Sequence, residues 1–290
     1  CVEFNERFRY ADPVADAAFL AMDLEFRGRR DLSRVFAEAY FDASGDEEGR
    51  ALLPLYKAYR AVVRGKVEGM KAREEEVPED ERGRALQRAR AHFLLTLEIL
   101  SPPAERPCLT LVGGLPGTGK TLLAGGLEET AGFTRITSDL VRKELAGVKE
   151  GEETAAPFGE GIYTDAWNDR TYAACLERAE ALLFEGKRVL VDASFREEKR
   201  RRAFLDAARR WGVPALFLVC ETEAREVRAR LERRLGDASD ADWEIYREAA
   251  ARWEPLGEKT EKAARPVRNT GAPEEAVETA LRALASEGLV

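Results

Sequence analysis

Hydrophobic positions in the first hundred residues recur at helical spacing rather than in the alternation that marks strands. Phe19, Met22 and Phe26 fall on one face of a predicted helix, and later stripes repeat every three or four residues. Glycines and a charged turn that contains Pro78 separate these stripes. The pattern predicts an all-helical subdomain over residues 1–100.

The stretch 101–107 breaks this pattern, because three of its seven residues are proline and cannot continue a helix. We interpret it as a linker. From 108 to 290, short apolar runs alternate with helical stripes, which is typical of an α/β fold whose parallel sheet is covered by helices on both faces. The predicted strands are Cys108–Gly113, Thr134–Thr137, Arg188–Asp192, Ala215–Cys220 and Pro266–Asn269. The predicted helices cover residues 120–130, 139–146, 164–185, 196–211, 223–235, 239–253 and 273–286.

The first predicted strand leads directly into a glycine-rich phosphate-binding motif. Its residues are Gly114, Leu115, Pro116, Gly117, Thr118, Gly119, Lys120 and Thr121. The strand before the motif and the helical pattern from Leu122 onward supply the context that a P-loop requires. The glycines let backbone N–H groups turn toward phosphates, and the helix N-terminus adds its dipole. The motif predicts ATP binding, with Lys120 on the β- and γ-phosphates and Thr121 on Mg²⁺.

Asp192 ends the third predicted strand and is the candidate for a second metal-binding oxygen. The alternative is an ordinary strand-terminal aspartate that faces solvent. The next residue is Ala193, where many P-loop motor ATPases carry a glutamate that activates water. The N-K-x-D motif that reads guanine is also absent from the sequence. These features favour transfer of the γ-phosphate to an acceptor over hydrolysis.

A second candidate pair follows the next predicted strand. Asp139 and Arg142 are three residues apart, on one face of a short predicted helix. A carboxylate there is suited to accept the proton of an acceptor hydroxyl, while the arginine steadies the acceptor or the transferring phosphoryl group. The alternative is that Ser138 or Asp139 only caps the helix.

An arginine-rich stretch runs from 196 to 234. We interpret most of its arginines as solvated helix faces. Arg230 and Arg234 are four residues apart on one predicted face, just before the break at 236–240. They are the candidates for a lid that brings arginines onto the triphosphate, with surface ion pairing as the alternative.

The overall composition narrows the possible partners. The net charge of -8 at pH 7 argues against a protein that coats nucleic acid. The apolar runs are far shorter than a bilayer span, so no membrane partner is expected. Four scattered cysteines favour free thiols in a reducing cytoplasm. His92 is the only histidine, so acid–base chemistry falls to carboxylates. Nothing in the sequence predicts the oligomeric state.

Residues 107–288 resemble the P-loop kinases grouped with polynucleotide kinase, gluconate kinase and zeta toxins. The resemblance is carried by GLPGTGKT, by SDLVRKEL at 138–145, by VDASF at 191–195 and by RLERRLGDASDADW at 230–243. In polynucleotide kinases an Asp-x-x-Arg after the second strand pairs a general base with a positioning arginine, and Asp139 and Arg142 match it. The resemblance also implies that Asn269 lies where the nucleotide base is contacted.

Residues 1–100 resemble the C-terminal helical part of aminoglycoside phosphotransferase-like proteins. The segments CVEFNERFRY at 1–10 and FLAMD at 19–23, with Asp16, carry this resemblance. Proteins that join such a domain to a P-loop kinase are known as predicted bifunctional enzymes, and the chain resembles one that has lost its beginning. The family's metal-binding Asp and H-G-D loop fall before Cys1, so the helical part is not expected to phosphorylate aminoglycosides.

Together these features predict an ATP-dependent kinase that uses Mg²⁺ and acts on a hydroxyl group of a small-molecule acceptor, with its P-loop domain at 108–290. Two rivals stay open. One is a kinase that acts on the 5′-hydroxyl of a polynucleotide with the same residues. The other is a nucleotide-dependent switch or toxin-like module without a small-molecule acceptor.

Overall fold

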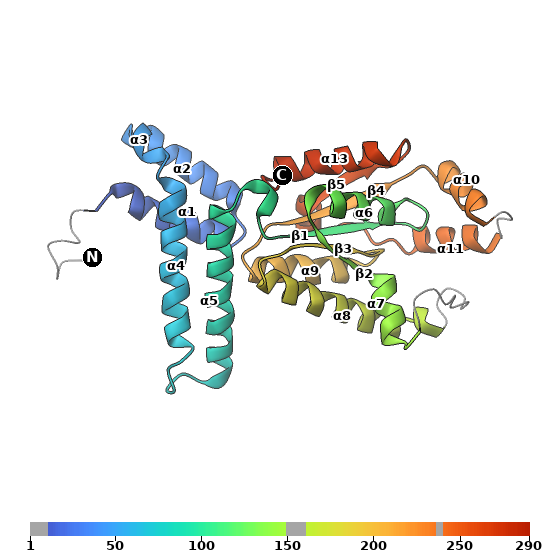
Figure 1. Ribbon diagram of the computed structural model, residues 1–290, viewed down its shortest axis with the longest axis horizontal. Coiled ribbons are helices and arrows are strands. Elements are labelled where there is room, and N and C mark those ends of the chain that lie inside the picture. Colours follow the sequence, from blue (N-terminus) through green and yellow to red (C-terminus); the bar gives the residue numbers. More distant parts are fainter. Residues whose placement is uncertain (1–10, 149–160, 236–239) are drawn as a thin grey trace. The chain divides into compact units, whose positions relative to one another are not determined.

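The computed structural model describes residues 11–148, 161–235 and 240–290 (Figure 1), with the backbone alone described at 163, 232–235 and 240–242. Contacts between residues divide the chain into two compact units. The helical unit comprises Cys1–Pro102 and Arg209–Pro214, and the P-loop unit comprises Pro103–Ala208 and Ala215–Val290. Within the described ranges, every helix is too short or too polar to cross a membrane.

The helical unit is built from amphipathic and alanine-rich helices. Its helices are α1 (Pro13–Phe26), α2 (Arg30–Ser44), α3 (Glu47–Arg50), α4 (Leu53–Lys71) and α5 (Glu79–Leu100). α1 starts where it does because Asp12 caps it, accepting a hydrogen bond from the backbone N–H of Val14 at 2.9 Å. α4 and α5 pack along each other, and small residues such as Ala61 and Ala89 on their buried faces allow close approach. Residues 11–100 are helical apart from short connections, as predicted for this part of the chain.

The P-loop unit is organised around five parallel strands in the order β2-β3-β1-β4-β5. The strands are β1 (Cys108–Gly114), β2 (Thr134–Thr137), β3 (Arg188–Asp192), β4 (Ala215–Glu221) and β5 (Ala264–Arg268). The helices are η2 (Pro103–Glu105), α6 (Lys120–Ala131), α7 (Ser138–Leu145), η3 (Gly161–Tyr163), α8 (Asp165–Phe184), α9 (Glu198–Arg210), α10 (Ala224–Leu235), α11 (Asp240–Ala251), α12 (Glu258–Ala263) and α13 (Pro273–Ser286). The predicted α/β fold class is confirmed.

Helices cover both faces of this sheet, as Figure 1 shows. α6 and α13 bury one face against a core that includes Val112, Leu127 and Leu284. α8 and α9 lie on the other face, where the rings of Tyr172, Phe195, Phe204 and Phe217 pack edge to face. Every residue of β1 and of β3 is buried, which explains why these strands are almost continuous hydrophobic runs in the sequence.

Most elements of the P-loop unit match the predicted bounds to within one or two residues, and the segment before and within β5 differs most. β5 spans Ala264–Arg268, although its prediction began at Pro266 and included Asn269. A proline fits within β5 because this strand lies at the edge of the sheet, where a missing N–H breaks no ladder. Helix α12 was not predicted, because its six residues contain no periodic apolar positions. Both differences lie in the segment that returns to the last strand.

Candidate active site

The loop between β1 and α6 is the predicted P-loop, and its glycines are required by geometry. Gly117 and Gly119 have positive φ angles of 76° and 87°, which residues with a Cβ rarely adopt. Gly117 also lies so close to α10 that a Cβ there would approach the Cγ1 of Val227 to 2.8 Å. These glycines let the loop curl at the N-terminus of α6, where backbone N–H groups bind anions.

Side chains of the P-loop and of the segments after β4 and β5 donate hydrogen bonds to backbone carbonyl groups of the loop. The Nζ of Lys120 and the Oγ1 of Thr118 both donate to the carbonyl oxygen of Leu115, each at 2.8 Å. The carbonyl oxygen of Thr118 accepts hydrogen bonds from Asn269 at 3.0 Å and from Thr222 at 3.3 Å. The loop conformation is therefore held by contacts to the ends of β4 and β5, while Lys120 folds back over it.

Asp192 provides the strongest indication of a metal ion. Its side chain is only 3% exposed, and its Oδ2 has no hydrogen-bond partner among the described residues. Burial raises the pKa of Asp192, against the opposing effects of Lys120 nearby and of a hydrogen bond with Thr121. A buried, unsatisfied carboxylate oxygen is costly unless a cation completes it.

The donor set around Asp192 fits Mg²⁺. A carboxylate and the hydroxyl of Thr121 are hard oxygen ligands, which Mg²⁺ prefers. No group of three or more metal-ligating side chains occurs in the described residues. That is compatible with Mg²⁺, which usually takes one or two protein ligands together with phosphate oxygens and water.

Asp139 and Arg142 lie on α7 but make different contacts. Asp139 is in the first turn, its side chain is 51% exposed, and its Oδ2 lies 3.3 Å from the Nζ of Lys143. Its charge raises the pKa of Asp192, as the smallest of the effects that act on it. Arg142 is buried and donates to the carbonyl oxygen of Ile162 at 2.8 Å and to the Oδ1 of Asn168 at 2.7 Å. Arg142 thus joins α7 to the start of α8.

The capping alternative can be judged from the start of α7. The N-cap position is Thr137, and its side chain makes no capping hydrogen bond. Ser138 and Asp139 are the first two residues inside the helix. A capping role therefore does not account for Asp139 in this structure.

The predicted lid arginines are only partly described. Arg230 lies on α10 and donates to the carbonyl oxygen of Asn269 at 2.7 Å and to Glu226 at 2.8 Å. This places Arg230 beside the P-loop, because Asn269 itself binds the backbone of Thr118. Asn269 is 5% exposed, and its side-chain amide supports the P-loop. Its predicted contact with the base of the nucleotide stays a prediction. The side chain of Arg234 lies outside those described.

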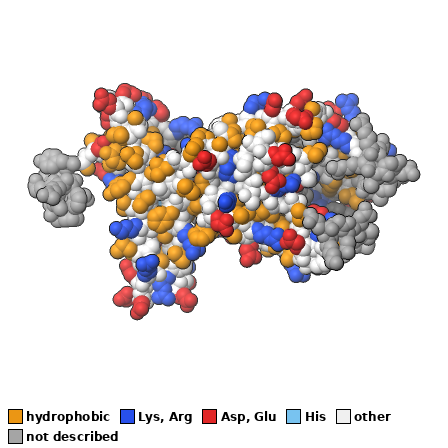
Figure 2. Space-filling model, viewed as in Figure 1, with side chains coloured by type: hydrophobic (Ala, Val, Ile, Leu, Met, Phe, Trp, Pro, Cys, Tyr) orange, Lys and Arg blue, Asp and Glu red, His pale blue; other side chains and the backbone are white. Residues whose placement is uncertain are grey.

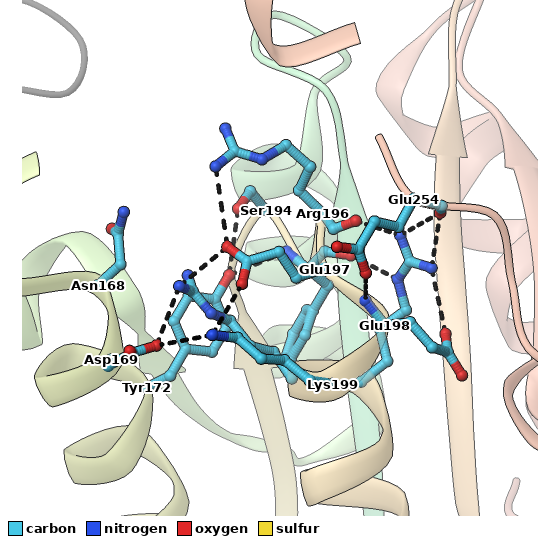
Figure 3. Close-up of polar contacts among 12 residues, drawn as sticks. Asn168, Asp169, Tyr172, Ser194, Arg196, Glu197, Glu198, Lys199 and Glu254 are labelled. Carbon is cyan, nitrogen blue, oxygen red and sulfur yellow. Dashed lines mark hydrogen bonds and ion pairs between the residues drawn. The ribbon is translucent and has the colours of Figure 1, made fainter. Parts of the chain in front are cut away.

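The sequence prediction missed a polar network on the loop that follows Asp192. Tyr172 of α8 accepts a hydrogen bond from the backbone N–H of Phe195 at 3.0 Å and lies 3.1 Å from the Oγ of Ser194 (Figure 3). Phe195 has a φ of 48°, a conformation that non-glycine residues rarely adopt. Such strain persists only where the surroundings enforce it, and here it turns the chain just after the metal-binding candidate.

Two arginines of α9 are exceptions to the solvated faces expected of this stretch. Arg200 is buried and contacts Glu197 at 2.9 Å and Asp169 at 3.2 Å. Arg201 is completely buried and donates to the carbonyl oxygen of Phe195 at 2.6 Å. The available signal in the sequence was the pair of consecutive arginines that follows the strand ending at Asp192. Their partners come from distant segments, which sequence spacing does not reveal.

The sheet, the P-loop and the buried aspartate at the end of β3 define a P-loop nucleotide-binding domain. A family model described as an AAA domain matches residues 109–256, just over half of the chain. The chain belongs to this AAA domain family.

Curated relatives extend beyond this domain. Uncharacterized proteins of Mycobacterium bovis and of Mycobacterium tuberculosis are each 37% identical over 254 residues, which cover 87% of this chain and 49% of the relative. The chain spans about half the length of the curated relatives it matches.

Solved structures are similar to part of the chain. A gluconokinase from Sinorhizobium meliloti 1021 is 20% identical with a TM-score of 0.48, covering 63% of this chain and 94% of that one. A shikimate kinase from Acinetobacter baumannii in complex with shikimate is 17% identical with a TM-score of 0.45, covering 63% and 96%.

Proposed function

We propose that the P-loop unit is an ATP-dependent phosphotransferase that moves the γ-phosphate of Mg·ATP to a hydroxyl group of a small-molecule acceptor. The observation that carries this proposal is the buried carboxylate of Asp192. Asp192 forms a hydrogen bond with Thr121 of the P-loop, over which Lys120 folds back, and its Oδ2 has no partner among the described residues. This arrangement suits a metal-bound triphosphate better than a structural role, which would leave the carboxylate without compensation.

Each residue of the loop has a distinct task in this proposal. Lys120 exchanges the carbonyl of Leu115 for oxygens of the β- and γ-phosphates when nucleotide binds. Thr121 and Asp192 hold Mg²⁺, which neutralises charge that develops on the phosphate oxygens. The backbone N–H groups of Gly117, Gly119, Lys120, Thr121 and Leu122 surround the phosphates.

On the acceptor side, Asp139 accepts the proton of the attacking hydroxyl. It is half-exposed and therefore accessible to a small molecule, and its charge acts on Asp192. Arg142 contributes by fixing α7 against α8 as well as by its charge. Arg230 and Arg234 on α10 supply positive charge to the transferring phosphoryl group.

The helical unit contributes no residue to this chemistry. We place it with the C-terminal helical part of aminoglycoside phosphotransferase-like proteins, as its sequence resemblance implies. Residues 1–10, which carry much of that resemblance, lie outside the described residues.

An acceptor screen tests the proposed function. Release of ADP from Mg·ATP is followed with panels of small alcohols, sugars and 5′-hydroxyl oligonucleotides. We expect a small alcohol to stimulate ADP release, and Lys120→Ala to lower that rate by about 10²–10³-fold, because one preorganised charge on the transition state is lost. The matched control is Lys187→Ala, an exposed lysine in the turn before β3.

Three outcomes overturn the proposal in different ways. ADP release that only oligonucleotides stimulate would identify the protein as a polynucleotide kinase. ADP release that needs no acceptor and responds only to a protein partner assigns a switch. Turnover that Lys120→Ala leaves unchanged removes the P-loop from the reaction.

A further inference from the structure

A pocket of about 570 Å³ lies beside the P-loop, over the carboxyl-terminal end of β4 and the first half of β5. Leu115 and Thr118 of the P-loop form part of its lining. Trp253, Leu256 and Pro266 supply much of its apolar surface. A molecule in this pocket therefore contacts the loop that binds phosphates, yet the predicted site residues Asp139 and Asp192 are not part of the lining.

The charged side chains that line this pocket are all acidic among the described residues. Glu221, at the end of β4, and Glu261, on α12, both line it, and none of the described lining residues is basic. Neither carboxylate makes a hydrogen bond or an ion pair with a described side chain. Other carboxylates nearby are paired: Glu198 binds Arg201, and Glu258 binds Lys262. The lining thus offers two acceptor groups for a cation and an apolar surface between them.

The apolar wall is rigid before any ligand arrives. The guanidinium of Arg201 lies 4.6 Å from the centre of the Trp253 ring, and Arg201 donates to the carbonyl oxygens of Glu254 at 2.9 Å and Pro255 at 3.2 Å. Arg201 is completely buried, so these contacts are shielded from water. A prebuilt wall lowers the entropy cost of binding.

Arg201 also connects the segment that carries Trp253 to the end of β3, where the candidate metal ligand Asp192 lies. Arg201 also donates to the carbonyl oxygens of Phe195 and Arg196, each at 2.6 Å, in the loop that follows Asp192. Figure 3 shows Glu254 beside Glu198 and Arg196 in this network. Because one buried side chain holds both segments, a ligand on Trp253 keeps a fixed position relative to the phosphate site.

We infer that this pocket binds the acceptor through a ring that carries an ammonium group. The ammonium pairs with Glu221 or with Glu261, and the ring packs on Trp253 and Leu256 beside the P-loop. This inference rests on the proposed phosphotransferase function and narrows its substrate class to amino alcohols.

A matched pair of probes tests the inference. Trans-4-aminocyclohexanol and cyclohexane-1,4-diol have the same ring and a hydroxyl, and they differ in the ammonium group. Calorimetric titration of the whole chain is expected to show about 3- to 20-fold tighter binding of the amine, the gain of one or two solvent-exposed ion pairs. Glu221→Gln with Glu261→Gln should abolish this preference. Glu258→Gln, one turn from Glu261 on α12 but outside the pocket lining, should preserve it.

Several results overturn the inference. Equal affinity for the two probes in the wild-type chain does so, as does a preference that survives in the double variant. Tight binding of the amine without stimulation of ADP release removes the acceptor assignment. Each single variant and a thermal melt serve as checks where the double variant folds poorly.

Failure of this inference is distinguishable from failure of the proposed function. A neutral alcohol that stimulates ADP release in a Lys120-dependent manner, with no advantage for the amine, retains the kinase and rejects the pocket assignment. Absence of Lys120-dependent ADP release with every acceptor rejects the kinase itself.

Discussion

The two units bury their apolar side chains to different extents. In the P-loop unit, one continuous core joins β1, β4, α6 and α13. In the helical unit, the compact core is small: Met22, Ala61 and Leu95 with a few partly buried neighbours. Most exposed large hydrophobic side chains of the described residues are also in the helical unit (Figure 2), including Leu55, Tyr59, Val67, Met70, Phe93 and Leu100.

This difference separates the two kinds of task in the chain. The P-loop unit has a complete core and carries every candidate for chemistry. Many buried positions of the helical unit are alanines, such as Ala18, Ala58 and Ala91, and each alanine removes little apolar area from water. The helical unit is therefore expected to be the less stable unit, and its exposed face is expected to promote self-association.

The largest expected effect is on the rate of phosphoryl transfer, and it tests whether the P-loop unit carries the chemistry through Asp139. Asp139→Asn keeps the size of the side chain and removes its charge. A positioned base contributes about 10²–10⁴-fold in rate, so kcat should fall by that factor while the affinity for Mg·ATP stays nearly unchanged. Single-turnover kinetics on the true acceptor measures the effect.

Glu144→Gln is the matched control for this variant. Glu144 lies on the same helix, α7, and pairs with Arg178 on the surface. It should keep the wild-type rate. Near-wild-type phosphoryl transfer by Asp139→Asn would show that its carboxylate is not the base.

The second prediction compares the same substitution in the two units. Leu127 is fully buried in the core of the P-loop unit, and Leu127→Ala should cost about 2–5 kcal/mol in unfolding free energy. Leu55 in α4 is 57% exposed, and Leu55→Ala should change the stability of the monomeric chain, measured at low concentration, by less than about 0.5 kcal/mol. Urea unfolding measures both.

A large cost for Leu55→Ala would break the comparison. It would mean that the exposed face of α4 is covered in solution by a second copy of the chain. Sedimentation of the wild type and of Leu55→Ala at matched concentrations separates this case from an error in the assignment of the face.

The third prediction uses the burial of Asp192. Its raised pKa means that the folded state holds the proton more tightly than the unfolded state. This contribution to stability is present at low pH and is lost as pH rises through the folded pKa, so at neutral pH the ionised carboxylate opposes folding. Without nucleotide, Asp192→Asn should therefore stabilise the P-loop unit at pH 7 by about 1 kcal/mol.

Mg·ATP should make the wild type more stable than Asp192→Asn, the reverse of the order expected without nucleotide. Mg·ATP should raise the melting temperature of the wild type more than that of Asp192→Asn, because the variant lacks one metal ligand. A thermal melt with and without Mg·ATP measures both effects. A variant that is less stable than wild type without nucleotide, and equally stabilised by it, would contradict the assignment of Asp192.

The sequence predicted the features that depend on neighbouring residues. The strand that precedes the P-loop and the aspartate at the end of β3 follow from local patterns, and the structure has both strands as predicted or within one residue. Contacts between distant segments did not follow. Arg201 binds carbonyl groups 53 and 54 residues further along the chain, and no spacing rule connects them.

Arg142, which was singled out from the sequence, illustrates the same limit. Arg142 was expected to act beside Asp139, because they share a helix face. The structure places its guanidinium on Asn168, which lies 26 residues away at the start of α8. Burial decides such partners, because a buried guanidinium needs acceptors wherever the fold supplies them.

The smallest expected effect distinguishes the two units by pH. His92 is the only histidine in the sequence, and it lies in the helical unit, where it is 4% exposed. Its ring stacks on Phe26 with centroids 3.7 Å apart, and its Nδ1 lies 2.8 Å from the carbonyl oxygen of Arg88. Burial lowers the pKa of His92 below 6.5, and the charge of Arg64 adds to this, while Glu68 and Asp23 oppose it.

A lowered folded pKa means that the unfolded chain binds the proton more readily than the folded chain. The stabilisation from neutral His92 is therefore complete above pH 6.5 and is lost as pH falls toward the folded pKa. Between pH 7 and pH 5 the helical unit should therefore lose stability from this source. His92→Phe keeps an aromatic ring on Phe26 and cannot titrate, so it should remove this loss while the P-loop unit behaves as in the wild type. Urea unfolding of both proteins at the two pH values, followed by circular dichroism, measures the difference. An unchanged pH dependence in His92→Phe would assign the acid sensitivity of the helical unit to its carboxylates instead.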